Sequence, residues 1–231
     1  MREARHWLTA PHWSSNIPLE TAHPRLAILA RRGWVRLRDA DPVPAEEWSS
    51  LEYIDTGGGD TAIARLTSPD GEPDGRLWRD GHAGPDKGAL FTSNAHRRHA
   101  LVEHVRSAGA EFGRVQVIRI EPQSRDRALA GIHRDDNNRF NPAGEGWIVR
   151  SWLELTDVEG SYMILMEQGP GGLPDPATEQ QIPLRRGARF VVDSQRLWHV
   201  VCHPATEPRY ALITCYESGP ALDRWIQAER A

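Results

Sequence analysis

Residues 186–216, RGARFVVDSQRLWHVVCHPATEPRYALITCY, decide the fold of this chain. They hold three apolar runs, 188–193, 199–202 and 210–216, in which β-branched and aromatic residues recur. Such residues favour strands, and the short segments between the runs carry Ser and Pro, which are typical of turns. Short strands separated by turns predict an antiparallel β-sandwich or barrel.

The same texture begins upstream, at residue 113. Three further apolar runs occupy residues 115–120, 147–155 and 161–167. The next segment, 169–183, holds three Gly and four Pro and is predicted to be a loop. The β core of the chain is therefore expected within residues 113–217.

The N-terminal hundred residues are predicted to be mostly helical, with one early strand. Residues 25–32 are apolar at helical spacing, residues 44–53 have Pro near their start, and a Ser or Asn can cap a third helix over 93–108. Residues 34–38 alternate like a strand. Residues 55–89 are rich in Gly, Pro and Asp and predict a long loop.

These segments predict one domain over residues 1–231, with a mainly β (α+β) fold. Residues 1–112 are expected to form a helical flank with lid loops, residues 113–217 the β core, and residues 218–231 a C-terminal helix. No repeat and no hinge-like linker divides the chain. A chain of this length is long enough to bury a sizeable core as one unit.

The composition of the chain limits the kinds of binding partner to expect. The net charge is -4 and the sequence pI is about 6.2, so no basic field indicates nucleic acid or an anionic membrane. The two cysteines, Cys202 and Cys215, form no metal or redox motif, and no stretch is long enough to span a bilayer. We therefore expect a cytoplasmic protein that acts on a small-molecule substrate, with its oligomeric state left open.

The segment His133-Arg134-Asp135 contains two side chains that could bind a metal ion. In an extended chain, residues two apart point to the same face, so His133 and Asp135 can reach one ion together. One neutral imidazole and one carboxylate are two parts of the triad that holds non-haem Fe(II). The competing interpretation is a surface turn, in which the Asp and Asn residues of HRDDNNRF only serve turn geometry. Asp136 is expected to face the other way.

A third metal ligand must come from a distant strand that faces the same site. His199 is the preferred candidate, because it follows a strand and a short turn and opens another apolar run. His203 is the alternative, but Pro204 follows it and it lies in a polar turn.

Arg209 lies ten residues after His199 and opens the last strong strand. If the two strands form an antiparallel pair, Arg209 lies beside His199 and points into the same site. A guanidinium fork binds a carboxylate through two hydrogen bonds and keeps its charge, so it suits the remote carboxylate of a dicarboxylic acid. A surface ion pair is the other use of an Arg at such a position.

The order His133-x-Asp135, then His199, then Arg209 resembles the Fe(II)/2-oxoglutarate dioxygenase superfamily. Residues 186–193 are similar to the strand that precedes its distal histidine, and residues 147–163 resemble the aspartyl/asparaginyl hydroxylase and proline 3-hydroxylase branch. The resemblance covers roughly residues 113–217. It implies a double-stranded β-helix, the jelly-roll or cupin-like fold.

The resemblance also implies roles for two arginines. Arg209 would hold the 2-oxoglutarate cosubstrate, and Arg150 matches an Arg that helps hold cosubstrate or substrate, although on an edge strand it could face water. Many members have a Ser two residues after the cosubstrate Arg, where this chain has Ala211. Ser151 and Tyr162 are the candidates for the missing hydroxyl.

The implied activity is hydroxylation of an unactivated C–H bond with Fe(II), 2-oxoglutarate and O2. Asp135 favours oxygenation, because related halogenases replace this carboxylate with Gly or Ala. The expected substrate is a small amino acid, a peptide or an amino-acid-derived natural-product intermediate. The alternatives are a metallo-cupin that does not use 2-oxoglutarate, such as an isomerase or another dioxygenase, and a non-catalytic ligand-binding jelly roll.

Overall fold

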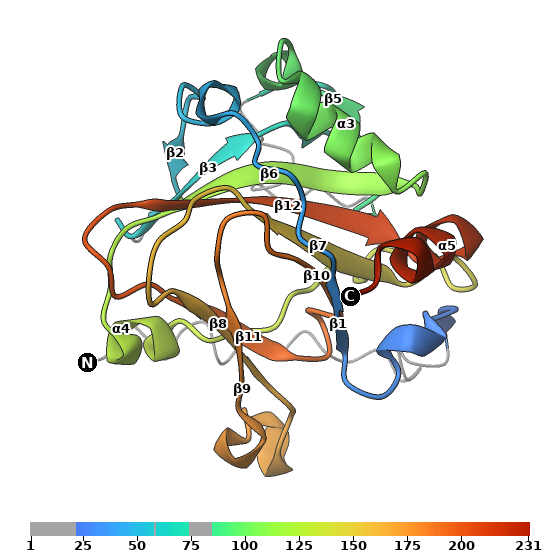
Figure 1. Cartoon of the computed structure of the whole chain (residues 1–231). Helices are drawn as coiled ribbons and strands as arrows, with labels where there is room; N and C mark the ends of the chain where they lie inside the picture. Colours follow the sequence, from blue (N-terminus) through green and yellow to red (C-terminus); the bar gives the residue numbers. More distant parts are fainter. Residues whose placement is uncertain (1–21, 58, 74–84) are drawn as a thin grey trace.

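The computed structural model describes residues 22–57, 59–73 and 85–231, and its centre is two antiparallel β-sheets, one above the other in Figure 1. The large sheet has the strand order β1 (Trp34–Leu37), β10 (Arg189–Val192), β7 (Ile148–Glu154), β12 (Arg209–Glu217), β6 (Phe112–Ile120), β3 (Thr61–Arg65) and β2 (Ile54–Asp55). The small sheet has the order β11 (Trp198–Cys202), β8 (Tyr162–Met166) and β9 (Gln180–Pro183).

The other elements lie outside these two sheets. Strands β4 (Thr67–Ser68) and β5 (Leu90–Phe91) pair with each other, and the α-helices of the described residues are α3 (His99–Ser107), α4 (Arg125–Ala130) and α5 (Pro220–Glu229). Single 3-10 turns occupy Ala27–Leu29, Ala45–Glu47, Ser93–Ala95, Pro170–Gly172 and Pro176–Thr178. No helix in these parts of the chain has the length and apolar character needed to cross a membrane.

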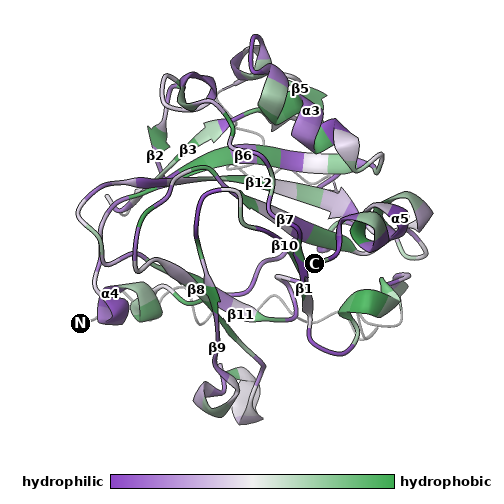
Figure 2. Cartoon of the chain, in the orientation of Figure 1, coloured by the Kyte–Doolittle hydropathy of each residue, from purple (hydrophilic) through white to green (hydrophobic). Residues whose placement is uncertain are grey.

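The core lies between the two sheets. It is built from alternate residues of the facing strands, such as Trp152 of β7, Ile213 of β12, Phe190 of β10 and Met163 of β8. In Figure 2 the facing strands carry much of the hydrophobic colour, whereas the connecting loops are mainly hydrophilic. A period of two in the sequence therefore directs one face of each strand into a shared interior.

The outer face of the large sheet is covered as well. Leu101 and Val105 of α3 pack on one part of it, and Leu222 and Ile226 of α5 pack on another. Strand β7 lies under this cover, and all seven of its residues are buried. This explains why the run 147–155 has apolar residues on both faces of the strand: a strand that is buried on both faces has no solvent side.

The prediction for the C-terminal half is confirmed. All six apolar runs are strands, namely β6, β7, β8, β10, β11 and β12, and the C-terminal helix is α5. The mainly β prediction is confirmed too, and two facing antiparallel sheets are consistent with the jelly roll. Strand β9 was missed, because it occupies the end of the Gly- and Pro-rich segment 169–183.

The predicted helical flank is wrong for most of the described N-terminal residues. Segments 25–32 and 44–53 hold one 3-10 turn each, and the third predicted helix is a 3-10 turn followed by α3. The first turn ends at Leu29, and Gly33, which has a φ of +70° and lies against the Leu197 side chain, follows four residues later. Since Trp34 then enters the large sheet, no length remains for a helix.

The predicted loop over residues 55–89 is also wrong in part. Strand β3 lies within it and pairs with β6, and β4 follows directly. The segment TAIAR did not indicate a strand because Ala has a low β propensity, yet Ala62 and Ala64 are buried on the outer face of the sheet. Residues 58 and 74–84 of this predicted loop lie outside the described residues.

Candidate metal centre

The small sheet brings His133 to His199. The backbone N–H of His133 donates to the carbonyl of His199 at 3.2 Å, and the N–H of His199 donates back at 2.8 Å. Two residues further on, the N–H of Asp135 donates to the carbonyl of Ser194 at 2.9 Å. The segment before β7 therefore extends the edge of the small sheet, and residues 66 positions apart in the sequence become neighbours.

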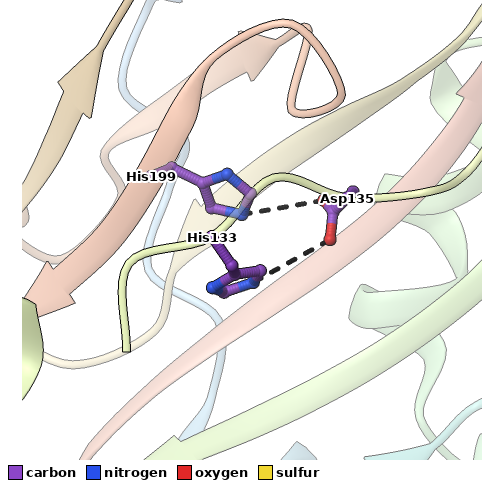
Figure 3. Close-up of side chains that lie close together, drawn as sticks. All are labelled: His133, Asp135 and His199. Atoms are coloured by element: carbon purple, nitrogen blue, oxygen red, sulfur yellow. Dashed lines mark ion pairs between the residues drawn. The ribbon is translucent and has the colours of Figure 1, made fainter. Parts of the chain in front are cut away.

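The three predicted ligands point toward one another in Figure 3. Their nearest ligand atoms all lie within 4.8 Å of one another. The Nε2 atom of His199 is 3.6 Å from Asp135 Oδ2, and the Nε2 atom of His133 is 3.9 Å from Asp135 Oδ1. Asp135 and His199 are buried, whereas His133 is exposed, so the group lies at the edge of the interior, open to solvent on one side.

Backbone carbonyls fix the tautomer of both imidazoles. The Nδ1 of His133 lies 2.9 Å from the carbonyl of Gly131, and the Nδ1 of His199 lies 3.2 Å from the carbonyl of Leu197. A carbonyl only accepts, so Nδ1 carries the proton in each ring and Nε2 presents its lone pair. A metal ligand oriented in this way by its other ring nitrogen is the usual arrangement in metalloproteins.

The charges suit a metal as well. Burial lowers the pKa of His199 to about 4, so its ring is neutral at neutral pH. Burial alone would raise the pKa of Asp135, but the positive charge of Arg150, with smaller effects from His199 and His133, brings it down to about 2. Both groups are thus in the form that ligates a cation.

The donor set fits non-haem Fe(II). Two imidazoles and one carboxylate that leave other coordination positions open are the arrangement that such iron enzymes use. The Asp135 carboxylate is buried, and its two oxygens face the Nε2 atoms of His133 and His199, so a cation between them would complete the site.

Arg150 of β7 lies directly beside this group. Its Nη1 is 2.9 Å from Asp135 Oδ2, and its Nη2 donates to Asn137 Oδ1 at 3.4 Å. The side chain is buried on the inner face of the large sheet and does not face water. Arg150 therefore holds the metal-ligating carboxylate in position and lies within reach of any molecule bound there.

Arg209 is buried in the interior, but the predicted pairing that placed it there is wrong. Strand β11 pairs with β8 in the small sheet, whereas β12 pairs with β6 and β7 in the large sheet. The turn over 203–208 crosses from one sheet to the other. Arg209 is 1% exposed and forms an ion pair with Glu154, a residue whose role the sequence analysis missed.

The other candidates lie elsewhere. His203 is buried, with Nδ1 at 2.8 Å from Ser161 Oγ and Nε2 at 2.6 Å from the carbonyl of Glu207, so it closes a turn and is not part of the ligand group. Ser151 alternates with the inward-facing Arg150 on β7, and Tyr162 packs on the outer side of the small sheet. Neither hydroxyl points into the interior beside Arg209.

A buried arginine that the sequence analysis did not single out, Arg65 of β3, lies on the inner face of the large sheet beside Gln116, to which it donates a hydrogen bond. Burial, with the positive charges of Arg114 and Arg150, lowers its pKa to about 9. The sequence did not predict this position, because β3 lies within the segment 55–89, which is rich in Gly, Pro and Asp and was predicted to be a loop. Arg65 and Arg150 therefore both lie in the interior, close enough for their charges to interact.

Buried amides hold the HRDDNNRF segment in place. The side-chain amide of Asn138 donates to Gln195 Oε1 at 2.9 Å and to the carbonyl of Ile148 at 3.1 Å. Its Oδ1 accepts from the Ile148 N–H at 2.8 Å. These bonds tie the segment to β7 and to the turn before β11. The surface-turn interpretation does not fit residues as buried as Asn137 and Asn138.

Comparisons with known proteins agree with the geometry at the level of the fold. No family model and no curated protein matches the sequence. The structure is similar to an oxidoreductase of the 2OG-Fe(II) oxygenase family from Burkholderia pseudomallei, with a TM-score of 0.51 and 16% identity over 85% of this chain and 95% of that chain.

Two weaker likenesses accompany it. The 2-oxoglutarate-dependent carbocyclase SnoK of nogalamycin biosynthesis has a TM-score of 0.49 and 14% identity over 88% of this chain and 85% of its own. HygX from Streptomyces hygroscopicus, with nickel and 2-oxoglutarate bound, has a TM-score of 0.43 and 14% identity over 84% and 85%. The fold is similar to that of the Burkholderia 2OG-Fe(II) oxygenase, in agreement with the fold that the resemblance to this superfamily implied; the likeness to the aspartyl/asparaginyl hydroxylase branch stays a prediction.

Proposed function

We propose that this protein is a non-haem Fe(II) and 2-oxoglutarate-dependent oxygenase. His133, Asp135 and His199 hold the iron, and Arg209 and Arg150 orient the cosubstrate 2-oxoglutarate. The observation that carries the proposal is the meeting of the three ligand atoms within 4.8 Å, in the protonation states that bind a cation. The fold, similar to that of a 2OG-Fe(II) oxygenase, supports it.

The protein's own residues prepare the site. His133 and His199 present Nε2 because backbone carbonyls hold their Nδ1 protons. Arg150 holds Asp135 against the two imidazoles by its 2.9 Å contact. When bound, Fe(II) supplies the activation of O2 and the oxidation of a substrate C–H bond, which the protein's side chains cannot perform.

Arg209 suits the remote carboxylate of 2-oxoglutarate. It is the first residue of β12, and its side chain lies on the inner face with Ala211 and Ile213. In this dry interior a guanidinium binds a carboxylate far more strongly than in water. The reaction would hydroxylate a small amino acid, a peptide or an amino-acid-derived natural-product intermediate, and the retained Asp135 supports oxygenation.

We also propose that residues 1–231 act as one domain, since strands from both halves of the chain share the large sheet. Both cysteines are free and buried, which supports a reducing, cytoplasmic setting. The partner we propose is the small-molecule substrate.

The test is reconstitution of the metal-free protein with Fe(II) and 2-oxoglutarate. Without oxygen, a weak visible charge-transfer band should appear as 2-oxoglutarate binds, and with oxygen, succinate should form. A metallo-cupin that does not use 2-oxoglutarate would bind the metal without forming the band or succinate. A ligand-binding jelly roll would give neither metal binding nor turnover, and either result would refute the proposal.

The role of Arg209 in binding the remote carboxylate of 2-oxoglutarate can be tested in the same assay. Arg209→Lys keeps the charge but loses the fork, so the Kd of 2-oxoglutarate should rise by about one to two orders of magnitude. The matched variant Arg119→Lys, on the neighbouring strand β6 but partly exposed and paired with Glu121, should bind as the wild type does. An unchanged Kd for Arg209→Lys would move the anchor to Arg150.

A further inference from the structure

The buried Arg209–Glu154 pair does not use all of its hydrogen-bonding atoms. The pair uses one nitrogen and one oxygen, and it leaves Arg209 Nη1 and Glu154 Oε1 buried and unpartnered. Trp152, two residues before Glu154 on the same face of β7, directs its buried indole N–H at the Glu154 carboxyl group. Each of the three residues is at least 95% buried. A protein interior seldom keeps such atoms unless something else satisfies them.

These atoms belong to one face of the large sheet. Glu154 lies directly opposite Ala211, and Arg209 is two residues from Ala211 on the same side of β12. Ala211 presents only a methyl group at this place. The Trp152 indole lies close enough to Glu154 to influence the ionisation of its carboxyl. The Arg209 guanidinium and the Trp152 indole therefore both lie beside the Glu154 carboxyl group, and a second carboxylate that took its place on Arg209 could accept from the same donors.

The difficulty is the charge of Glu154. Two carboxylates cannot share one guanidinium in a dry interior while both are ionised, because their repulsion is not screened. One must be neutral, and a neutral carboxylic acid can then donate a hydrogen bond to the ionised one. The same physics keeps one proton on paired catalytic carboxyl groups in other enzymes.

Burial makes the neutral form of Glu154 accessible. It raises the pKa of the carboxyl group, although Arg209 and the hydrogen bond from Trp152 oppose this, with a smaller effect from Arg36 of β1. The other elements packed here present Phe190 of β10, Ile118 and Ile120 of β6, and Met163 and Ile182 of the small sheet, none of which is charged. His203 faces Arg209 from the turn before β12.

We propose that Glu154, as a neutral carboxylic acid, donates a hydrogen bond to the remote carboxylate of 2-oxoglutarate and shares it with Arg209. This assignment rests on the proposed function and names the residue that completes the cosubstrate site. In the absence of cosubstrate, the Glu154 carboxylate takes the place on Arg209. Cosubstrate binding then adds one proton to Glu154 and leaves the guanidinium to the incoming carboxylate.

The direction of the pH dependence follows from this exchange. A second anion beside Glu154 raises the pKa of its carboxyl group further, so binding takes up a proton. Above the pKa of Glu154 in the cosubstrate-free protein, the Kd of 2-oxoglutarate should rise about tenfold for each pH unit. A variant that cannot ionise at this position should show no such slope.

The experiment measures 2-oxoglutarate binding to the Fe(II)-loaded protein without oxygen, through the visible band, at a series of pH values. Glu154→Gln keeps the shape and an N–H donor, so it should bind within about threefold of the wild type at low pH and lose the slope. Glu154→Met keeps the length but has no donor, and its Kd should rise about tenfold. Glu159→Gln, on an exposed turn, is the control for the same chemical change.

Infrared difference spectra add a readout that needs no comparison of affinities. The wild-type complex with 2-oxoglutarate should show the C=O band of a protonated carboxylic acid, and Glu154→Gln should lack it. The proposal is overturned if that band is absent, or if Glu154→Gln weakens binding as much as Glu154→Met. If the wild type fails to bind 2-oxoglutarate at all, the proposed function itself is wrong.

Discussion

Two adjacent aspartates show how a single residue position decides chemistry. Asp135 is buried beside His199 and Arg150, whereas Asp136 is exposed and its nearest cation is Arg139 at 3.8 Å. The extended backbone between them turns their side chains to opposite sides. This confirms the prediction from the sequence that Asp136 faces away from the ligand group.

The pair provides a matched test of the metal ligand. Asp135→Asn should weaken Fe(II) binding by at least about tenfold, because it removes an anionic ligand and leaves Arg150 without a counter-charge. Asp136→Asn should bind Fe(II) as the wild type does. Anaerobic metal titration measures both, and equal affinities for the two variants would contradict the assignment.

The same comparison applies to the histidines near β11. His199→Ala should abolish the visible band of the Fe(II) and 2-oxoglutarate complex. His203→Ala should keep the band but lower the free energy of unfolding by about 1–3 kcal/mol, because Ser161 and the carbonyl of Glu207 lose their buried partner. Urea denaturation and the visible spectrum separate the two effects, and a lost band in His203→Ala would exchange the two roles.

At the scale of the elements, the close approach of β7 and β12 is what brings the inner-face residues together. Gly146 precedes β7, and a Cβ atom there would lie 1.9 Å from the carbonyl oxygen of Ser218, just after β12. The N–H of Ser218 donates to the carbonyl of Trp147 at 2.8 Å, so the two strand ends are tied at this point. A side chain at 146 would have to push them apart.

Gly146→Ala should therefore lower the free energy of unfolding by about 1–3 kcal/mol. Gly219→Ala is the matched control, because its φ of 171° is ordinary extended backbone and a Cβ there meets nothing within 4 Å. Denaturant unfolding compares the two variants with the wild type. Equal stability of Gly146→Ala and Gly219→Ala would mean that the strand ends are free to separate.

Over the whole molecule, the buried His199 and the half-buried His104 tie stability to pH. Burial lowers the pKa of His199 and of His104 on α3 to about 4, while a histidine in the unfolded chain titrates near 6.5. Between these values the unfolded state binds more protons, so the metal-free protein loses stability as the pH falls from 6.5 to 4. Asp193 and Glu154, whose pKa values are raised by burial, act in the opposite direction.

A variant outside the metal centre isolates one contribution. His104→Gln should remove up to about 3 kcal/mol of the stability lost by the metal-free protein between pH 6.5 and pH 4. At pH 7 and above, where His104 is neutral in both states, its effect on this slope is absent. Urea unfolding curves across this pH range measure the change, and a slope equal to that of the wild type would show that His104 is protonated in the native state.

The sequence alone determined the strands of the C-terminal half and named the ligand group. Alternating apolar residues between turns leave few other structures for residues 113–217, and this periodicity is a local property of the chain. His133 and Asp135 are also a local signal, because two residues of an extended segment share a face. The choice of His199 over His203 followed from their places in the strand and in the turn, and the metal role of all three ligands awaits the titrations above.

Tertiary structure alone decided which strands are neighbours. Arg209 does not lie on a strand beside β11, because the chain crosses to the other sheet after His203. The interior positions of Arg65 and Glu154 follow only from the strand order, in which β3 pairs with β6 and β7 lies between β10 and β12. Strand pairing depends on burying both faces of the large sheet at once. The free energy gained by this burial comes from contacts between the sheets and the helices that cover them, so no single segment of the sequence reveals it. The metal ligands were therefore readable from local spacing, whereas the buried partners that tune the interior were not.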